Sequence, residues 1–418
     1  MTGTGDAKAS FLLLFLVLMV VAAGNNALSS VMPAIGREIG MADLMIAMVF
    51  SVSAALWTLT APYWGRKSDQ HGRKKLIRLG LIGYVVSTTG AGVVVLAGLS
   101  GWLTPVLTFL LFTLLRSLFG LLGSAANPAA QAYVAARTTG EARTNALATL
   151  SSAFGLGTVL GPAVAPFMVV PILGLSGPLF GFALLAVITM LAVNRYLPDD
   201  APGSLGWRKD DTPALPLRWR DRRIAPFLGV GFVAGSAQAA MTQCTGFLII
   251  DHLALSPAKA QSFIGVALMA GAGATLVAQW GLIRMLRMTP KALLQWGTGL
   301  CLAGAAIMAM AGSYGTIVTG FAIISLGAGF VRPGFTAGAS LAVRVEEQGA
   351  VAGAVTAING ACFIISPAVG VALYHVAQPL PFALSGLLLA GTLAYALTND
   401  TVRQAGRTPV PETPTPEQ

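Results

Sequence analysis

Long apolar runs alternate with short polar segments over nearly the whole chain. A helix needs about 20 apolar residues to cross roughly 30 Å of hydrocarbon, so runs of this length predict membrane-spanning helices. The runs lie at residues 11–32, 44–64, 76–98, 102–126, 146–170 and 174–196, and then at 224–248, 262–283, 292–311, 315–337, 350–373 and 379–398. The pattern predicts an all-α integral membrane protein with twelve transmembrane helices.

A polar segment at residues 197–223 divides the runs six and six, and it holds five acidic residues, six basic residues and several prolines. We therefore expect a cytoplasmic linker between two six-helix halves, at residues 11–196 and 224–398. Residues 1–10 form a cytoplasmic N-terminus, and the proline-rich tail at 399–418 lacks the apolar content to fold and is predicted to be disordered.

Short motifs recur at corresponding places in the two halves. Trp64-Gly65 precedes the first charged connection, and Trp280-Gly281 precedes its counterpart. Gly161-Pro162-Ala-Val likewise matches Ser366-Pro367-Ala-Val. Internal repeats of this kind are common in membrane transporters, so the halves are expected to be related by duplication.

Lysine and arginine concentrate in alternate connections between the runs. These connections and the two termini hold 22 of the 26 basic residues, whereas the opposite connections hold only Arg37 and Lys259. Because cytoplasmic loops of membrane proteins are enriched in basic residues, both termini are expected in the cytoplasm. We expect a protein embedded in the lipid bilayer of a bacterial inner (plasma) membrane.

The composition agrees with this class and narrows the alternatives. Only 10% of the residues are charged, against about 25% in soluble domains. The net charge of +10 is spread over predicted cytoplasmic loops and does not indicate nucleic-acid binding. Three isolated cysteines give no disulfide or zinc pattern, and we expect neither a metal nor a cofactor.

The segment G-R-K-S-D-Q-H-G-R-K-K, from Gly65 to Lys75, concentrates charge between two runs and predicts a hairpin joining two helices. Asp69 can pair with Arg73, or accept hydrogen bonds from free N–H groups at the start of another helix. Gly65 and Gly72 permit tight turns and close approach. The alternative is a solvated loop whose basic residues only fix the topology.

This hairpin resembles the loop between the second and third helices of the major facilitator superfamily, with Gly65, Asp69, Gly72, Arg73 and Lys74 at the family positions. The resemblance implies two six-helix halves around a central cavity. It also implies that the hairpin is a conformational latch, which contacts the start of the eleventh helix near residues 350–352.

Two further segments resemble drug:proton antiporters of the tetracycline and multidrug efflux type. R-S-L-F-G-L-L-G-S-A, starting at Arg116, resembles the membrane arginine motif, although Phe119 replaces the common glutamine. Gly157-x-x-x-Gly161-Pro162 resembles the motif of proton-driven exporters, with some of the expected glycines missing. The resemblance implies that Arg116 serves proton transfer or substrate contact, and that the glycine pair seals the halves on one side. The alternative for Arg116 is an arginine satisfied by backbone carbonyls and neighbouring amides. Plain helix packing is the alternative for the glycines.

Polar residues inside the runs outline the substrate cavity, because the helices that carry them line the cavity in this family. They are Asn25, Asn26, Ser29, Ser151, Gln238, Gln243 and Asn359. Hydrogen bonds between helices are the competing use of each.

No acidic residue falls in the middle of a run, and Asn25 and Asn26 stand where many proton-coupled exporters carry an acid. The candidates for proton coupling are therefore Arg116 and three titratable residues at the edges of runs, Asp43, Asp251 and His252. Ordinary interfacial residues are the alternative interpretation.

These observations predict a secondary active transporter that works as a monomer and exports small organic molecules by alternating access, in exchange for protons. Drugs, siderophores or metabolites that are neutral or anionic are favoured, because Arg116 has no acid in a run to accompany it. An uncoupled or exchanging carrier, or an importer, is the first alternative. An integral membrane enzyme is the second, although the three histidines are too scattered to form a catalytic cluster.

Overall fold

A computed structural model describes residues 4–135, 137–138, 140–199, 221–343 and 348–404. The first half contains α1 (Thr4–Ile39), α2 (Asp43–His71), α3 (Arg73–Leu99), α4 (Pro105–Leu122), η1 (Gly123–Ala125), α5 (Ala126–Ala135), α6 (Gly140–Val164), η2 (Ala165–Met168) and α7 (Gly177–Tyr196). The second half contains α8 (Ala225–Leu253), α9 (Pro257–Leu276), η3 (Val277–Leu282), α10 (Ile283–Met285), α11 (Pro290–Ala309), α12 (Tyr314–Leu341), α13 (Gln348–Ala361), α14 (Ser366–Val376), α15 (Leu380–Thr398) and α16 (Asp400–Gln404).

The predicted fold class is confirmed, because every apolar run coincides with a helix or a consecutive series of helices. Ten spans among the described residues are long and apolar enough to cross a membrane. The remaining two runs coincide with the long helices α6 and α8, which are not among these ten spans. The number of twelve membrane-crossing helices therefore stays a prediction. Large apolar side chains are exposed on the outside of the bundle, as expected of a surface that contacts lipid.

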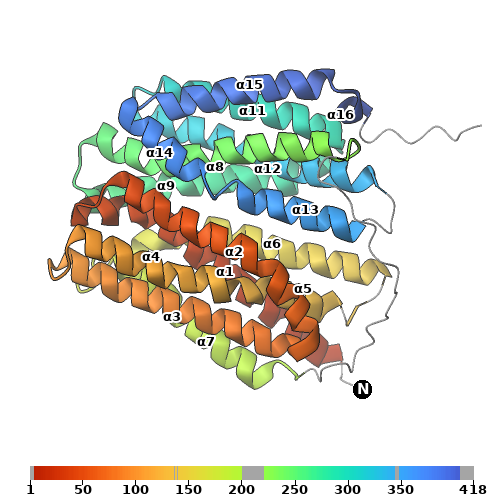
Figure 1. Ribbon diagram of the computed structural model, residues 1–418, viewed down its shortest axis with the longest axis horizontal. Coiled ribbons are helices and arrows are strands. Elements are labelled where there is room, and N and C mark those ends of the chain that lie inside the picture. The colour runs from red at the N-terminus through yellow and green to blue at the C-terminus, as the bar shows by residue number, and fades with distance from the viewer. Residues whose placement is uncertain (1–3, 136, 139, 200–220, 344–347, 405–418) are drawn as a thin grey trace, which may run out of the picture.

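The two halves lie side by side, with α1–α7 below and α8–α16 above in Figure 1. They meet where α1 and α6 pack against α9, and where α2 packs against α13 and α14. The two ends of the described chain lie at the right of Figure 1, which we call the near end. The far end is the opposite one, where Gly40 follows α1 and Ala254 follows α8.

The charged hairpin differs from its prediction. We expected the second helix to end near residue 64, but α2 continues through the charged segment to His71. The chain reverses at Gly72 alone, and α3 begins at Arg73. Gly72 has a φ of 90°, which a residue without a Cβ adopts at little cost. The charged residues 65–71 can remain helical because a helix can extend beyond the apolar part of its span.

The predicted eleventh span is not one continuous helix. α13 ends at Ala361, and α14 begins only at Ser366. The segment between the two helices forms hydrogen-bonded turns. Its N–H groups donate to carbonyls three or four residues earlier in the chain, at Cys362, Phe363 and Ile364. Pro367 lies in the first turn of α14, where its missing N–H costs no helical hydrogen bond. This span therefore consists of two shorter helices joined at mid-length.

Candidate functional site

One guanidinium at the far end joins a carboxylate from each half. Arg37, in the last turn of α1, donates from Nε to Asp43 Oδ1 at 3.1 Å and from Nη2 to Asp43 Oδ2 at 2.8 Å. It also pairs with Asp251 near the end of α8, where Nη2 lies 3.1 Å from Oδ2 and Nη1 donates to Oδ1. Planar forks of this kind hold carboxylates in a fixed geometry.

The helix α14 supplies two more partners from the second half. The Tyr374 hydroxyl donates to Asp251 Oδ2 at 2.6 Å. His375 Nε2 lies 3.6 Å from Asp43 Oδ2, so a charged histidine would form an ion pair with it. The Asp43 side chain is 6% exposed, while that of His375 is 54% exposed. We call these five residues, Arg37, Asp43, Asp251, Tyr374 and His375, the far-end cluster.

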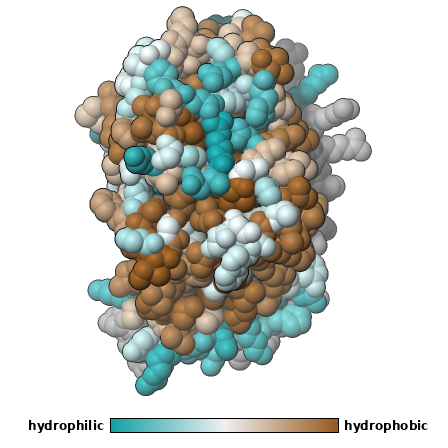
Figure 2. All heavy atoms as spheres, turned by 90° about the vertical axis from the view of Figure 1, so that its left-hand side faces the viewer, coloured by the Kyte–Doolittle hydropathy of each residue, from teal (hydrophilic) through white to brown (hydrophobic). Residues whose placement is uncertain are grey.

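Figure 2 views the far end and shows hydrophilic atoms gathered among apolar ones on this face. Two of the three titratable residues singled out from the sequence, Asp43 and Asp251, meet in the far-end cluster. The third, His252, is exposed next to Asp251. Sequence reasoning missed Tyr374 and the role of Arg37, although Arg37 is one of only two basic residues in the connections predicted to be external.

Glycine and proline bring the halves into close contact near this cluster. A Cβ added at Gly246 in α8 would lie 2.6 Å from Pro33 Cγ in α1. A Cβ added at Gly265 in α9 would lie 2.6 Å from Pro166 Cγ in η2 and 3.4 Å from the Pro162 carbonyl oxygen. Distances under 3.0 Å leave no room for a methyl group, so the far end is closed by direct contact between the halves.

The glycine pair of α6 packs within the first half. A Cβ at Gly157 would lie 2.5 Å from the Met19 carbonyl oxygen, and one at Gly161 would lie 2.1 Å from the Ala23 carbonyl oxygen. Both glycines therefore allow α6 to approach the backbone of α1. Pro162, directly after this pair, and Pro166 face Gly265 of the second half.

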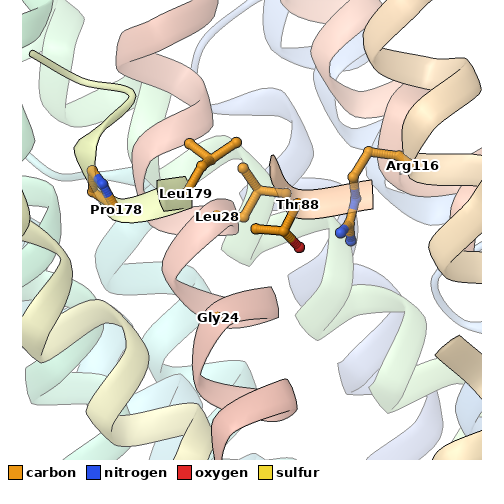
Figure 3. A pocket seen from close by; sticks show the side chains of 6 residues that line it. All are labelled: Gly24, Leu28, Thr88, Arg116, Pro178 and Leu179. Atoms are coloured by element: carbon orange, nitrogen blue, oxygen red, sulfur yellow. The ribbon is translucent and has the colours of Figure 1, made fainter. Parts of the chain in front are cut away.

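Arg116 lies inside the first half, and its side chain is buried (Figure 3). Nη2 donates to Asn25 Oδ1 of α1 at 2.7 Å, and the guanidinium carbon lies 4.6 Å from the centre of the Phe119 ring. The main-chain oxygen of Arg116 accepts a hydrogen bond from Ser53 Oγ at 3.2 Å. Among the described side chains, no carboxylate forms an ion pair with this arginine.

The other predicted cavity residues have varied environments. Asn26 Nδ2 donates to the Ala22 carbonyl at 2.8 Å, and Ser29 Oγ donates to the Asn25 carbonyl at 3.3 Å, so both side chains bond within α1. Half-buried side chains occur at Gln238, Gln243 and Asn359. The side chain of Ser151 lies outside the described part of the structure.

The second half has an arginine of its own near the interrupted span. Arg332 on α12 has an exposed side chain and lies within electrostatic range of the Cys362 thiol. Cys362, directly after α13, in turn has its Sγ 3.5 Å from the Phe232 carbonyl of α8. Ionisable residues inside membrane spans often mark the substrate or ion pathway of a transporter.

The predicted latch is only partly described. Lys74 is buried, and its Nζ lies 3.1 Å from Asp199 Oδ1 and 3.4 Å from the Asn194 carbonyl oxygen. It therefore links the start of α3 to the end of α7 within the first half. Arg73 is half-buried at the start of α3. The side chains of Asp69 and of residue 352 at the expected partner helix lie outside the described residues, so the latch remains a prediction.

Comparison with known proteins identifies the family. The Major Facilitator Superfamily model matches residues 14–367. Multidrug resistance protein 2 of Bacillus subtilis is 24% identical over 399 residues, which cover 92% of this chain and 93% of the relative. The multi-drug resistance efflux pump PmrA homolog of Lactococcus lactis is 30% identical over 167 residues, 38% of this chain and 36% of the relative.

A solved structure shares the fold. The crystal structure of the human organic anion transporter MFSD10 (TETRAN) superposes with a TM-score of 0.67 at 18% identity, covering 93% of this chain and 99% of that one. At this identity the likeness concerns the fold alone. The family match over most of the chain, together with the all-helical architecture, shows that the protein belongs to the major facilitator superfamily.

Proposed function

We propose that this transporter exports small organic molecules from the cytoplasm by alternating access, in exchange for protons. The observation that carries the proposal is the Arg37 guanidinium, which holds Asp43 of the first half and Asp251 of the second half at the far end. The distribution of basic residues supports placing the near end in the cytoplasm of a bacterial cell and the far end outside.

Alternating access requires the far end to open, and the proposed opening breaks a small set of contacts between the halves. These are the Arg37 pair with Asp251, the His375 pair with Asp43, and the glycine–proline contacts that close α8 and α9 against the first half. Packed interfaces of this kind have discrete arrangements and do not deform continuously. The proposed cycle therefore has two states of the far end, closed and open.

Two residues of the far-end cluster would respond to a bound proton in opposite senses. A protonated His375 would attract Asp43 across the boundary and strengthen far-end closure. An exporter driven by protons must return to the state closed on the outside after it binds a proton there, so a proton on His375 would favour that step. A proton on Asp251 would instead remove its attraction to Arg37 and weaken closure.

Neutral or anionic substrates fit this chain best. Among the described residues, the arginines at mid-span are Arg116 and Arg332, and no acid lies at mid-span to balance them. A bare organic cation would therefore lack a counter-charge in the low-dielectric interior. The names of the relatives, which refer to multidrug resistance, support a drug-like or metabolite-like substrate of small size.

An uncoupled or exchanging carrier is the second candidate. The neutral amide of Asn25, rather than a carboxylate, accepts the hydrogen bond from Arg116. A first helix without a titratable partner at this position favours a transport cycle in which substrate alone drives the conformational change.

Transport by the purified full-length protein in lipid vesicles tests the proposal. The vesicles have an acidic interior, and a panel of anionic, neutral and cationic compounds of similar size is added outside. Proton exchange predicts that the gradient raises the accumulation of anionic or neutral compounds, and that a protonophore abolishes the increase. Vesicles without protein provide the baseline. Accumulation that follows the substrate gradient but ignores the pH gradient would support the uncoupled carrier instead.

A further inference from the structure

A small cavity lies within the first half, between α1, α3, α4 and α7 (Figure 3). It is lined by Gly24, Leu28, Thr88, Arg116, Pro178 and Leu179. Its free volume of about 10 Å³ is enough for one group of about the size of a water molecule and too small for an organic substrate.

Two polar side chains that reach this cavity each have an atom without a hydrogen-bond partner. Thr88 is 5% exposed and Arg116 is 2% exposed, and neither Thr88 Oγ1 nor Arg116 Nε has a hydrogen-bond partner. The Tyr84 hydroxyl beside them is also buried and unpartnered. Although it lies close to the Thr88 hydroxyl, the two groups do not meet in hydrogen-bond geometry. Each of these groups can donate a hydrogen bond, and native proteins seldom leave such groups unsatisfied.

The positive charge of Arg116 beside the cavity has no negative partner among the described side chains. Arg116 remains positively charged in proteins, and its described contacts are the neutral amide of Asn25 and the ring of Phe119. A bare charge at the centre of a membrane span is costly, so a buried guanidinium requires compensation. A bound water would satisfy the donors but would leave the charge uncompensated.

We propose that this cavity binds a single monoatomic anion, with chloride as the physiological candidate. Arg116 Nε and the Thr88 hydroxyl, which both line the cavity, would donate to the anion, and the guanidinium would supply the opposite charge. The site would stabilise the first half from within. The inference does not depend on export or on proton exchange, because its test needs neither a transported substrate nor a proton gradient.

Thermal unfolding of the purified full-length protein tests the proposal directly. Chloride replaces gluconate at constant ionic strength, and bromide and sulfate are compared with it. A ligand that binds only the folded state stabilises it in a saturable manner. We expect chloride to raise the melting temperature with saturation and the larger bromide to do so more weakly. Sulfate, which is too large for the cavity, should give only the gradual, non-saturable rise of an excluded salt. A melting temperature that does not change with chloride would overturn the proposal.

Two variants with a matched control separate a specific site from a general salt effect. Thr88→Val removes one donor without changing the size of the side chain and should weaken the apparent chloride affinity by about tenfold, since hydrogen bonds to charged groups are strong. Thr298→Val is the control, because Thr298 is also fully buried and unpartnered but lies on α11 of the second half. Equal chloride dependence in the two variants would overturn the proposal.

Asn25→Asp gives an independent test that needs no loss of a donor. Asn25 Oδ1 already accepts from Arg116 Nη2 at 2.7 Å, so the new carboxylate would neutralise the guanidinium from within the protein. We expect this variant to be as stable in gluconate as the unmodified protein is in chloride, and to lose its response to chloride. A response that persists in Asn25→Asp would overturn the site even if Thr88→Val fails to fold.

Discussion

Arg37 and Asp251 lie 214 residues apart in the chain and form an ion pair between the two halves at the far end of the molecule. Their side chains are 21% and 27% exposed, so the pair is partly shielded from solvent. The same guanidinium also holds Asp43 of its own half, which keeps it oriented when the second half moves away. Opening of the far end therefore costs the Asp251 contacts but leaves Arg37 with a partner.

Asp251→Asn should shift the protein towards a state that is open at the far end. The substitution keeps the shape of the side chain and removes the charge that attracts Arg37, which we expect to change the equilibrium by roughly tenfold. Cys244 can report the change, because its thiol is fully buried and lies within electrostatic range of Asp43. In a background with Cys301 and Cys362 replaced by serine, labelling by a membrane-impermeant maleimide should rise.

The control for this experiment is Arg37→Gln, alone and combined with Asp251→Asn. Arg37→Gln should raise labelling too, and the double variant should add little, because both substitutions remove the same pair. Strictly additive effects would show that the two residues act independently.

His375→Gln should loosen the closure of the far end. His375 Nε2 lies 3.6 Å from Asp43 Oδ2, and a glutamine cannot form the ion pair that a charged histidine would form there. Labelling of Cys244 should therefore rise in this variant. His252→Gln is the matched control, since His252 is exposed at the end of α8 and should leave the labelling unchanged. Labelling of His375→Gln at the level of the unmodified protein would show that this pair does not hold the far end closed.

Gly265→Ala should prevent full closure of the far end. The added methyl group would meet Pro166 at 2.6 Å, and overpacking of this kind typically costs about 1–3 kcal/mol. Because the clash exists only when the halves are together, the cost falls on the closed state, and Cys244 labelling should rise while transport slows. Gly273→Ala, on the same helix, has open space around the new methyl group and should change neither measurement.

The helices were largely predictable from the sequence, whereas their pairing was not. Apolar runs long enough to cross a bilayer leave the backbone few alternatives to a helix, which explains the success of the predicted spans. The continuation of α2 to His71 was missed, because charged residues are compatible with a helix that extends beyond the membrane. The interruption after Ala361 was missed too, since residues 362–365 are apolar apart from one cysteine and contain no glycine or proline.

The candidate site shows the same limit. Asp43 and Asp251 were selected as titratable residues at the edges of runs. The sequence read by itself does not reveal that both pair with Arg37. Asn25 and Arg116 were likewise selected separately, and only the structure brings the amide oxygen within 2.7 Å of the guanidinium. Residue type and position indicated which polar or charged side chains lie in or beside apolar runs. Their hydrogen-bond and ion-pair partners depend on how the helices pack.

Gly161→Ala should destabilise the first half rather than shift the conformational equilibrium. A Cβ at this position would lie 2.1 Å from the Ala23 carbonyl oxygen of α1, so α6 must move away from its neighbour in every state of the cycle. We expect a loss of about 1–3 kcal/mol, measured as a lower melting temperature and a lower yield of folded protein. Gly155→Ala is the control on the same helix, because nothing lies within 4 Å of its added Cβ. If Gly161→Ala instead keeps the melting temperature and changes only Cys244 labelling, the glycine pair serves the movement between the halves, as its resemblance to the exporter motif implies.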